Sequence, residues 1–411
     1  MPNLPAPRAW LASKSCRFTI LERVFGQTVS IAPFTIPFSK VDVDDLRQRL
    51  DHIRWPDTAA TPAWEDGTDR HFLKGFCSYW KDEFDWQQQV EMLNSLPHFR
   101  FTENGLGIHF LHVRGKGPHP VPLVLTHGWP GSFLEMLCIL PLLTDPATHG
   151  GDAADAFDVV IPSLPGFGYS DRPASDDMNV FRVAEIWVEL MSALGYSRFA
   201  AQGGDIGAGV STALGLRYPD KILGVHLNYI PGSYKPFVEP GKEPNAAEKE
   251  YLATAARWYE EEGAYAHLHR TRPQTAAYAL NDSPAGLAAW LLEKFRVWSD
   301  CGGDLLSYFT RDQLLTNVTL YWMTQSIGSS MRMYRANGKA PLQFGREDFV
   351  RPPVALARFP KEILQVPRSW IERGYNLQRW TEMPRGGHFA AMEQPQLLAE
   401  DVRAFFRELR S

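Results

Sequence analysis

The chain has 411 residues, of which 44% are hydrophobic, and its formal net charge is −5. This length can bury a large core and favours one catalytic domain with additions over several independent units. The sequence has no basic stripe, which argues against nucleic-acid binding.

The first residues and the cysteines bear on location. The start, Met1–Gly26, carries Arg8, Lys14, Arg17 and Arg23 and has no apolar run long enough for a signal peptide or a membrane span. The cysteines, Cys16, Cys77, Cys138 and Cys301, are far apart and include no Cys-x-x-Cys pair, so free thiols in a reducing compartment are the simplest interpretation. We therefore expect a cytoplasmic protein without a membrane anchor.

The N-terminal part is expected to contain two helices, the second of them rich in tryptophan. The apolar spacing predicts an amphipathic helix near Val43–His52 and a second helix over Leu73–Asn94. Trp80 and Trp86 lie in the second helix. We interpret both as core residues that pack this part on the rest of the protein.

A buried strand is predicted at Val121–Thr126, where the chain is continuously apolar before the loop His127-Gly128-Trp129-Pro130-Gly131-Ser132. An apolar helix is predicted to follow over Phe133–Leu143. A His-Gly pair in such a loop can be an ordinary turn between a strand and a helix. Its functional interpretation depends on the strand and turn described next.

The run Gly203-Gly204-Asp205-Ile206-Gly207 has the form of a nucleophile elbow, with an aspartate where a serine is expected. The apolar segment Ser197–Ala201 predicts the strand before it, and Ile206–Tyr218 the helix after it. A carboxylate at this position can attack an electrophilic sp3 carbon and form an ester on the enzyme. Taken alone, the aspartate could equally be a helix cap in a glycine-rich turn.

The two loops together favour a hydrolase. In the α/β-hydrolase fold, the oxyanion hole combines one backbone N–H from the earlier loop with one from the residue after the nucleophile. The predicted donors are therefore the backbone N–H groups of Trp129 and Ile206. The loops also occur in the chain order that this fold requires.

A general base is predicted near the C-terminus. His388 follows a strand expected at Asn376–Met383 and precedes a helix expected at Gln394–Leu409, which is the place of the histidine in the order nucleophile, acid, histidine. Glu362 is the first carboxylate beyond the strand Val354–Phe359 and is expected to orient that histidine. Glu372 and Glu382 are the alternatives.

The expected fold class is therefore α/β, with a mostly parallel central sheet, because strands near Val121, Phe157, Phe199 and Ile222 alternate with helices. We divide the chain into an N-terminal segment (1–115), a first core part (116–230), a helical lid (231–350) and a second core part (351–411). A break rich in proline and glycine, Pro231–Pro244, marks the start of the lid. The lid inserted between strands would cover the elbow.

At this point the sequence resembles the microsomal-type epoxide hydrolases, α/β-hydrolases with an extra N-terminal segment wrapped on the core. Motifs along nearly the whole chain carry the resemblance: Tyr79-Trp80, Phe84-Asp85-Trp86, Leu93-Asn94, Ile108-His109-Phe110, His127 to Phe133, Pro165 to Ser170, Gly203-Gly204-Asp205, Ala279 to Pro284 and Arg385 to Ala391. Many members carry tryptophan directly after the nucleophile. This chain has Ile206 there, which keeps the backbone donor and changes the shape of the pocket.

The resemblance implies two lid tyrosines that hydrogen-bond the epoxide oxygen, and the matching positions are Tyr265 and Tyr334. Phenols can stabilise the alkoxide as it forms and donate a proton to it. Tyr259 and Tyr321 are the nearest competitors. The residues alone do not select among the tyrosines.

The implied reaction converts a hydrophobic epoxide and water to a vicinal diol through an ester on Asp205, with no metal or organic cofactor. A haloalkane dehalogenase also uses an elbow aspartate, but it binds halide with aromatic N–H groups, often from a tryptophan in the position of Ile206. A non-catalytic α/β-hydrolase relative normally lacks a triad member, whereas Asp205, Glu362 and His388 are all present. The expected assembly is a monomer or a homodimer.

Overall fold

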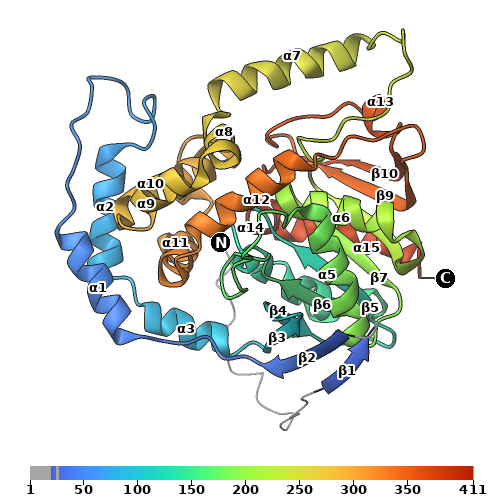
Figure 1. Cartoon of the computed structure of the whole chain (residues 1–411), viewed down its shortest axis with the longest axis horizontal. Coiled ribbons are helices and arrows are strands. Elements are labelled where there is room, and N and C mark those ends of the chain that lie inside the picture. Colours follow the sequence, from blue (N-terminus) through green and yellow to red (C-terminus); the bar gives the residue numbers. More distant parts are fainter. Residues whose placement is uncertain (1–19, 25–26, 411) are drawn as a thin grey trace.

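A single ten-stranded sheet runs through the protein (Figure 1). The computed structural model describes residues 20–24 and 27–410. The strand order is β1-β2-β3-β4-β6-β5-β7-β8-β9-β10. The strands are β1 (Ile20–Val24), β2 (Gln27–Pro33), β3 (His98–Glu103), β4 (Leu106–Val113), β5 (Val121–Thr126), β6 (Phe157–Pro162), β7 (Phe199–Gly203), β8 (Ile222–Leu227), β9 (Val350–Arg358) and β10 (Tyr375–Glu382).

The sheet has an antiparallel part and a parallel part. Strands β1 to β4 pair antiparallel with one another, and β4 pairs antiparallel with β6. From β6 to β10 every pairing is parallel. This confirms the predicted α/β-hydrolase fold with a mostly parallel sheet. The carboxyl ends of the parallel strands meet at one edge, where the loops that follow them gather.

Fifteen α-helices surround the sheet in the described part of the chain: α1 (Lys40–Asp51), α2 (Arg70–Asp82), α3 (Trp86–Asn94), α4 (Leu140–Thr144), α5 (Val180–Ala193), α6 (Asp205–Arg217), α7 (Ala246–Glu261), α8 (Ala264–Thr271), α9 (Pro273–Leu280), α10 (Pro284–Trp298), α11 (Arg311–Thr324), α12 (Ile327–Lys339), α13 (Arg368–Ile371), α14 (Ala390–Glu393) and α15 (Pro395–Arg407). Helix α6 packs on β5, β7, β8 and β9, and α15 packs on β8, β9 and α4. None of the described helices is long and apolar enough to cross a membrane.

Two predicted helices are each divided in the structure, and both predictions are wrong in this respect. The helix expected over Leu73–Asn94 is α2 followed by α3, because the side chain of Asp85 caps a new helix by accepting a hydrogen bond from the Gln88 N–H. The helix expected over Phe133–Leu143 is a short 3₁₀ helix, Phe133–Leu137, followed by α4. Pro141 lies in the first turn of α4, where its missing N–H costs nothing.

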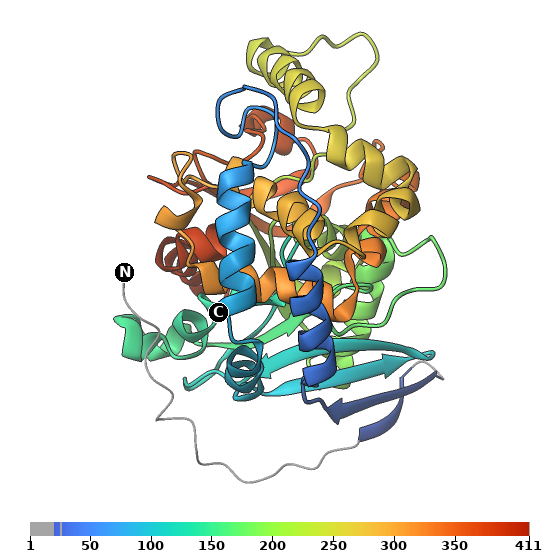
Figure 2. The same cartoon turned by 90° about the vertical axis from the view of Figure 1, so that its left-hand side faces the viewer.

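The N-terminal helices connect the sheet to the helices inserted between β8 and β9. Helices α1 and α2 pack against each other and against α10, as the two views agree (Figures 1 and 2). Trp80 and Trp86 are buried, as predicted for core residues. Helices α7 to α12 lie in the range expected for the lid, and α7 stands out from the body at the top of Figure 1.

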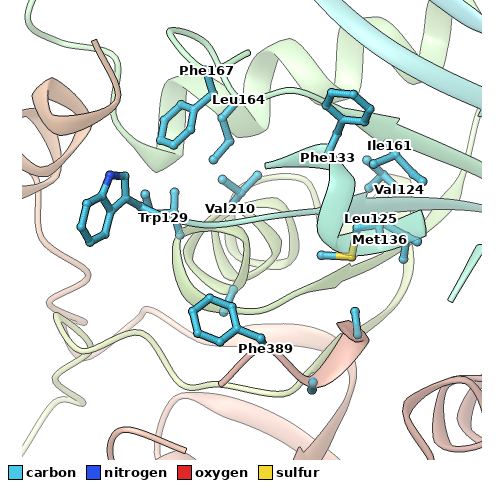
Figure 3. Close-up of a cluster of buried hydrophobic side chains, with 14 of the residues drawn as sticks. Val124, Leu125, Trp129, Phe133, Met136, Ile161, Leu164, Phe167, Val210 and Phe389 are labelled. Atoms are coloured by element: carbon cyan, nitrogen blue, oxygen red, sulfur yellow. The ribbon is translucent and has the colours of Figure 1, made fainter. Parts of the chain in front are cut away.

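At the elbow between β7 and α6, the backbone lies very close to the backbone at the end of β5. Asp205 adopts a φ of 47°, a left-handed conformation that is rare for any residue except glycine. A Cβ atom at Gly207 would lie 1.9 Å from the backbone oxygen of Thr126, at the end of β5. The neighbouring core, which includes Trp129, Val210 and Phe389, is shown in Figure 3.

Gly207→Ala tests this approach. Because the added Cβ meets backbone atoms that cannot rotate away, we expect the substitution to lower the free energy of unfolding by about 3 kcal/mol. Urea titration followed by circular dichroism measures the change. Gly75→Ala is the matched control, since a Cβ at that position in α2 meets nothing within 4 Å. Equal stability of the two variants would contradict the close approach.

Candidate active site

Four loops at the carboxyl edge of the parallel strands bring the predicted site residues together. Trp129 follows β5, Asp205 follows β7, Glu362 follows β9 and His388 follows β10. The corresponding side chains and backbone groups lie within hydrogen-bonding reach of one another, although the residues are far apart in the chain. In sequence the side chains occur in the order Asp205, Glu362, His388, which matches the order nucleophile, acid, histidine of the fold.

His388 lies between two carboxylates. Its Nδ1 is 2.6 Å from Oε1 of Glu362, and its Nε2 is 3.5 Å from Oδ2 of Asp205. Because an ionised carboxylate only accepts hydrogen bonds, Glu362 fixes the proton of a neutral imidazole on Nδ1 and leaves Nε2 free to act as a base. Both His388 and Glu362 are buried.

The two alternative acids are occupied elsewhere. Glu372 is exposed and pairs with Arg368 at 2.6 Å. Glu382 is also exposed and pairs with Arg358 at 2.9 Å. Neither carboxylate is near His388, so the geometry favours Glu362.

The charges around His388 determine its protonation. Burial lowers the pKa of His388, but the negative charges of Glu362 and Asp205 and their hydrogen bonds outweigh burial and raise the pKa well above its usual value. In the resting protein the imidazolium is therefore stabilised. Loss of either negative charge would shift this balance towards the neutral base.

One of the two predicted oxyanion donors already contacts the elbow carboxylate. The backbone N–H of Trp129 donates to Oδ1 of Asp205 at 2.9 Å. Among the described residues, no hydrogen bond joins the N–H of Ile206 to the same carboxylate. Of the two predicted oxyanion donors, the resting aspartate thus engages only the N–H of Trp129.

The two tyrosines implied by the resemblance lie next to each other above the elbow. Their ring centroids are 5.9 Å apart, and both rings contact that of Trp129, with Tyr265 stacked on it at 5.3 Å. Helices α8 and α12, which carry them, pack together. The hydroxyl of Tyr334 is buried, and its interaction with the hydroxyl of Tyr265 contributes to the raised pKa of its phenol.

Both tyrosines remain protonated at neutral pH. Burial is the main cause that raises the pKa of each phenol well above its usual value, and the negative charge of Asp205 adds to it. Of the competitors, Tyr259 is 48% exposed and Tyr321 donates its hydroxyl to the backbone oxygen of Gly131 at 2.7 Å. Tyr259 is therefore partly in solvent, and the hydroxyl of Tyr321 is already engaged.

Aromatic rings that the sequence did not reveal complete the wall of the site. Trp298 and Tyr229 contact the ring of His388 edge-on, with ring centroids 5.2 and 5.5 Å from that of His388, respectively. The ring of His269 lies 4.7 Å from that of Trp129 and 4.9 Å from that of Tyr334. His269 is four residues after Tyr265 on α8, a helical spacing that could have identified it.

Glu135 is a third carboxyl group at the site. A small cavity, whose volume open to the centre of a water molecule is about 10 Å³, is lined by Glu135, Gly128, Asp205, His388 and other residues. This space holds about one water molecule. Burial raises the pKa of Glu135 to about 8, and the nearby negative charge of Asp205 also raises it. Glu135 fills the space beside Gly131, where a Cβ would lie 1.3 Å from its Oε1.

No group of histidine, cysteine, aspartate and glutamate side chains that could hold a metal ion occurs in residues 20–24 and 27–410. The cysteines within these ranges, Cys77, Cys138 and Cys301, are free. Cys16 lies outside the described residues, as do most of residues 1–26, on which the expectation about targeting rests.

Comparisons with known proteins agree with this geometry. Residues 31–136 match the family described as epoxide hydrolase N terminus, and residues 121–280 match the α/β-hydrolase fold. Epoxide hydrolase 1 of Oryctolagus cuniculus is 40% identical over 405 residues, covering 92% of this chain and 88% of the relative.

Solved structures give the same result. Juvenile hormone epoxide hydrolase of Bombyx mori superposes with a TM-score of 0.82 at 32% identity and covers 93% of this chain and 96% of its own. Aspergillus niger epoxide hydrolase superposes with a TM-score of 0.79 at 33% identity and covers 92% and 96%, respectively.

The raised pKa of Glu135 predicts a dependence of stability on pH. A carboxyl group whose pKa is higher in the folded than in the unfolded state binds more protons when folded, so it destabilises the fold as pH rises from about 4.5 to about 8. Glu135→Gln removes this loss. The free energy of unfolding of the variant minus that of the wild type should therefore rise between pH 5.5 and pH 8, by up to about 1.4 kcal/mol per pH unit.

Urea unfolding at the two pH values measures the difference, and any constant effect of the amide cancels. Glu250→Gln, which removes the same charge from an exposed position on α7, is the control and should show no such trend. A difference for Glu135→Gln that is constant with pH would mean that Glu135 is not held protonated in the fold.

Proposed function

Because the chain belongs to the epoxide hydrolase family of the α/β-hydrolase fold, we propose that it converts an epoxide to a vicinal diol through a covalent ester on Asp205. The observation that carries the proposal is the position of the Asp205 carboxylate. It lies on a strained elbow, with one oxygen held by a backbone N–H and the other facing His388. A mere helix cap would need neither partner.

The first step is opening of the ring. An oxygen of Asp205 attacks a ring carbon while the hydroxyl groups of Tyr265 and Tyr334 hydrogen-bond the ring oxygen. The carbon–oxygen bond breaks, its electron pair passes to the oxygen, and a phenol supplies the proton. The high pKa of both phenols supports this role, since an ionised tyrosine could not donate.

The second step is hydrolysis of the ester. Esterification removes the negative charge of Asp205, which is one of the causes of the raised pKa of His388. His388 can then release its proton to the solvent, accept one from the attacking water and pass it to the departing alkoxide, while Glu362 keeps the imidazole oriented. A proton from the solvent restores the imidazolium after turnover. The cavity between Asp205, His388 and Glu135 is a suitable site for that water.

Water attacks the carboxyl carbon of Asp205, and the resulting oxyanion needs hydrogen-bond donors. The N–H of Trp129 already contacts Oδ1. We assign the N–H of Ile206 as the second donor, formed once the carboxyl carbon becomes tetrahedral. One such donor typically contributes about 3 to 4 kcal/mol to stabilisation of the transition state.

The surroundings support a hydrophobic substrate and a lid. Trp129, Trp298 and the two tyrosines present an aromatic wall to the elbow. We propose that the helices in the range 231–350 form a lid inserted between the core parts 116–230 and 351–411, and that residues 1–115 form the attached N-terminal segment. Ile206 offers no side-chain N–H to a halide, which disfavours the dehalogenase alternative.

The histidine variant His388→Gln should separate the two steps. Gln at this position cannot accept a proton from water, so the ester should form and persist. Intact-mass spectrometry after mixing with styrene oxide should show the enzyme mass plus the epoxide mass on Asp205. The double variant Asp205→Ala/His388→Gln is the control and should show no adduct. A folded His388→Gln protein that forms none would rule out the covalent order of steps.

The tyrosine variants test the first step alone. Either Tyr265→Phe or Tyr334→Phe should slow ester formation roughly ten- to hundredfold, because a hydrogen bond to a charged group contributes about 1.5 to 3 kcal/mol. Ester hydrolysis should change little. Single-turnover quench experiments separate the two rates, and Tyr259→Phe, at a half-exposed position, is the control. An unchanged rate of ester formation in Tyr265→Phe or Tyr334→Phe would remove that residue from the mechanism.

A further inference from the structure

Lys294 is a buried cation that the mechanism above does not use. It lies on α10, its side chain is only 8% exposed, and its Nζ lies 5.0 Å from the centre of the Tyr265 ring. The same Nζ lies 5.9 Å from the ring of Trp298. Lysine is rarely buried unless it is paired, so this position demands an explanation.

Two carboxylates lie beside the ammonium group. Nζ of Lys294 is 2.6 Å from Oε2 of Glu293 and 3.6 Å from Oε2 of Glu262. Glu262 precedes α8, the helix that carries Tyr265, so the ion pairs join α10 to the start of α8. The third titratable neighbour is His269. Burial, and then the charge of Lys294, lowers the pKa of His269 to about 3, so its ring is neutral.

The position of this cation distinguishes the two lid tyrosines. Tyr265 has an ammonium group over its ring, whereas no lysine or arginine of the described residues lies over the ring of Tyr334. A cation over an aromatic ring is attracted to its electron-rich face, and the attraction grows as the ring gains negative charge. The phenolate form of Tyr265 would gain more from Lys294 than the phenol does.

We propose that Lys294 is a positioning residue that stabilises negative charge on Tyr265, so that Tyr265 is the tyrosine that gives its proton to the epoxide oxygen. The inference rests on the proposed ring opening by Asp205. In that step the Asp205 oxygen bonds to carbon, the ring carbon–oxygen bond breaks, and the oxygen takes the Tyr265 proton, which leaves a phenolate. The proton released when Asp205 returns to a carboxylate after hydrolysis restores the phenol.

The need for such a cation follows from burial. Burial opposes the ionisation of Tyr265, and the charge of Asp205 opposes it further until the ester forms. The negative charge moves away from Asp205 during ring opening and towards the side of the site where Lys294 lies. Glu293 limits the effect, because its own negative charge also opposes ionisation of Tyr265.

Lys294→Met is the first test, because it removes the charge and keeps most of the packed side chain. We expect it to slow ester formation roughly five- to thirtyfold and to leave the rate of ester hydrolysis unchanged. Lys294→Arg keeps the charge and should restore most of the rate. Lys74→Met removes an equivalent cation that lies 5.4 Å from the ring of Trp55, on the surface, and should have no effect.

A double-mutant cycle with Tyr265→Phe gives the decisive result. A phenylalanine ring cannot become a phenolate, so Lys294→Met should cause no further loss of the ester-formation rate in that background. In the Tyr334→Phe background its full effect should remain. A purely structural role of Lys294 predicts equal, multiplicative losses in both backgrounds, and that result would overturn the proposal.

Glu293→Gln provides a second test that keeps Lys294 itself and has the opposite expected sign. It removes a negative charge beside Tyr265, so ester formation should proceed at or above the wild-type rate. If Glu293→Gln slows ester formation as Lys294→Met does, the ion pair is structural and the proposal is wrong. If the wild type forms no ester, or if Tyr265→Phe leaves ester formation unchanged, the proposed function is wrong. These results differ from those that contradict the role of Lys294, so the two proposals can be tested separately.

Discussion

The close approach of the β5 loop to the elbow after β7 is the constraint on which the site depends. A Cβ at Gly128 would lie 2.3 Å from Oδ1 of Asp205, and a Cβ at Gly207 would lie 1.9 Å from the backbone oxygen of Thr126. Because both positions are glycine, the N–H of Trp129 reaches the carboxylate. The left-handed conformation of Asp205 is stabilised by this packing and holds its side chain away from the helix it begins.

The N-terminal segment supports the helices whose aromatic residues lie over the elbow, and it lies outside the site itself. Its helices pack on α10, and polar contacts join it to the inserted helices: Thr68 donates to the backbone oxygen of Ala289, Arg49 pairs with Asp282, and Tyr79 donates to Asp312. Helix α10 carries Lys294 and Trp298 on its buried side. The added segment therefore fixes the helix that borders Tyr265 and His388.

Local patterns in the sequence were sufficient for the parallel strands and the elbow and insufficient where tertiary contacts decide. The strand at Val121–Thr126 has the predicted bounds, because a continuous apolar run with a glycine-containing loop has few other interpretations. The antiparallel β3–β4 hairpin was missed although Asn104-Gly105, with φ values of 50° and 80°, is a typical signal of a tight hairpin turn. Glu135, Lys294 and Trp298 carry no such local signal, since only the packing of distant helices gives them their neighbours.

In the proposed mechanism, the electrostatics of the site explain how one carboxylate can serve both steps. While Asp205 is ionised, it keeps His388 in its protonated form and opposes ionisation of the phenols, so neither water nor tyrosine reacts early. When the charge of Asp205 is lost in an ester, the neutral form of the His388 imidazole, which can act as a base, becomes more favourable. Glu362, whose carboxyl group lies beside Nδ1, then stabilises the imidazolium that forms as water loses its proton. The order of the two proposed steps thus follows from where the negative charge lies.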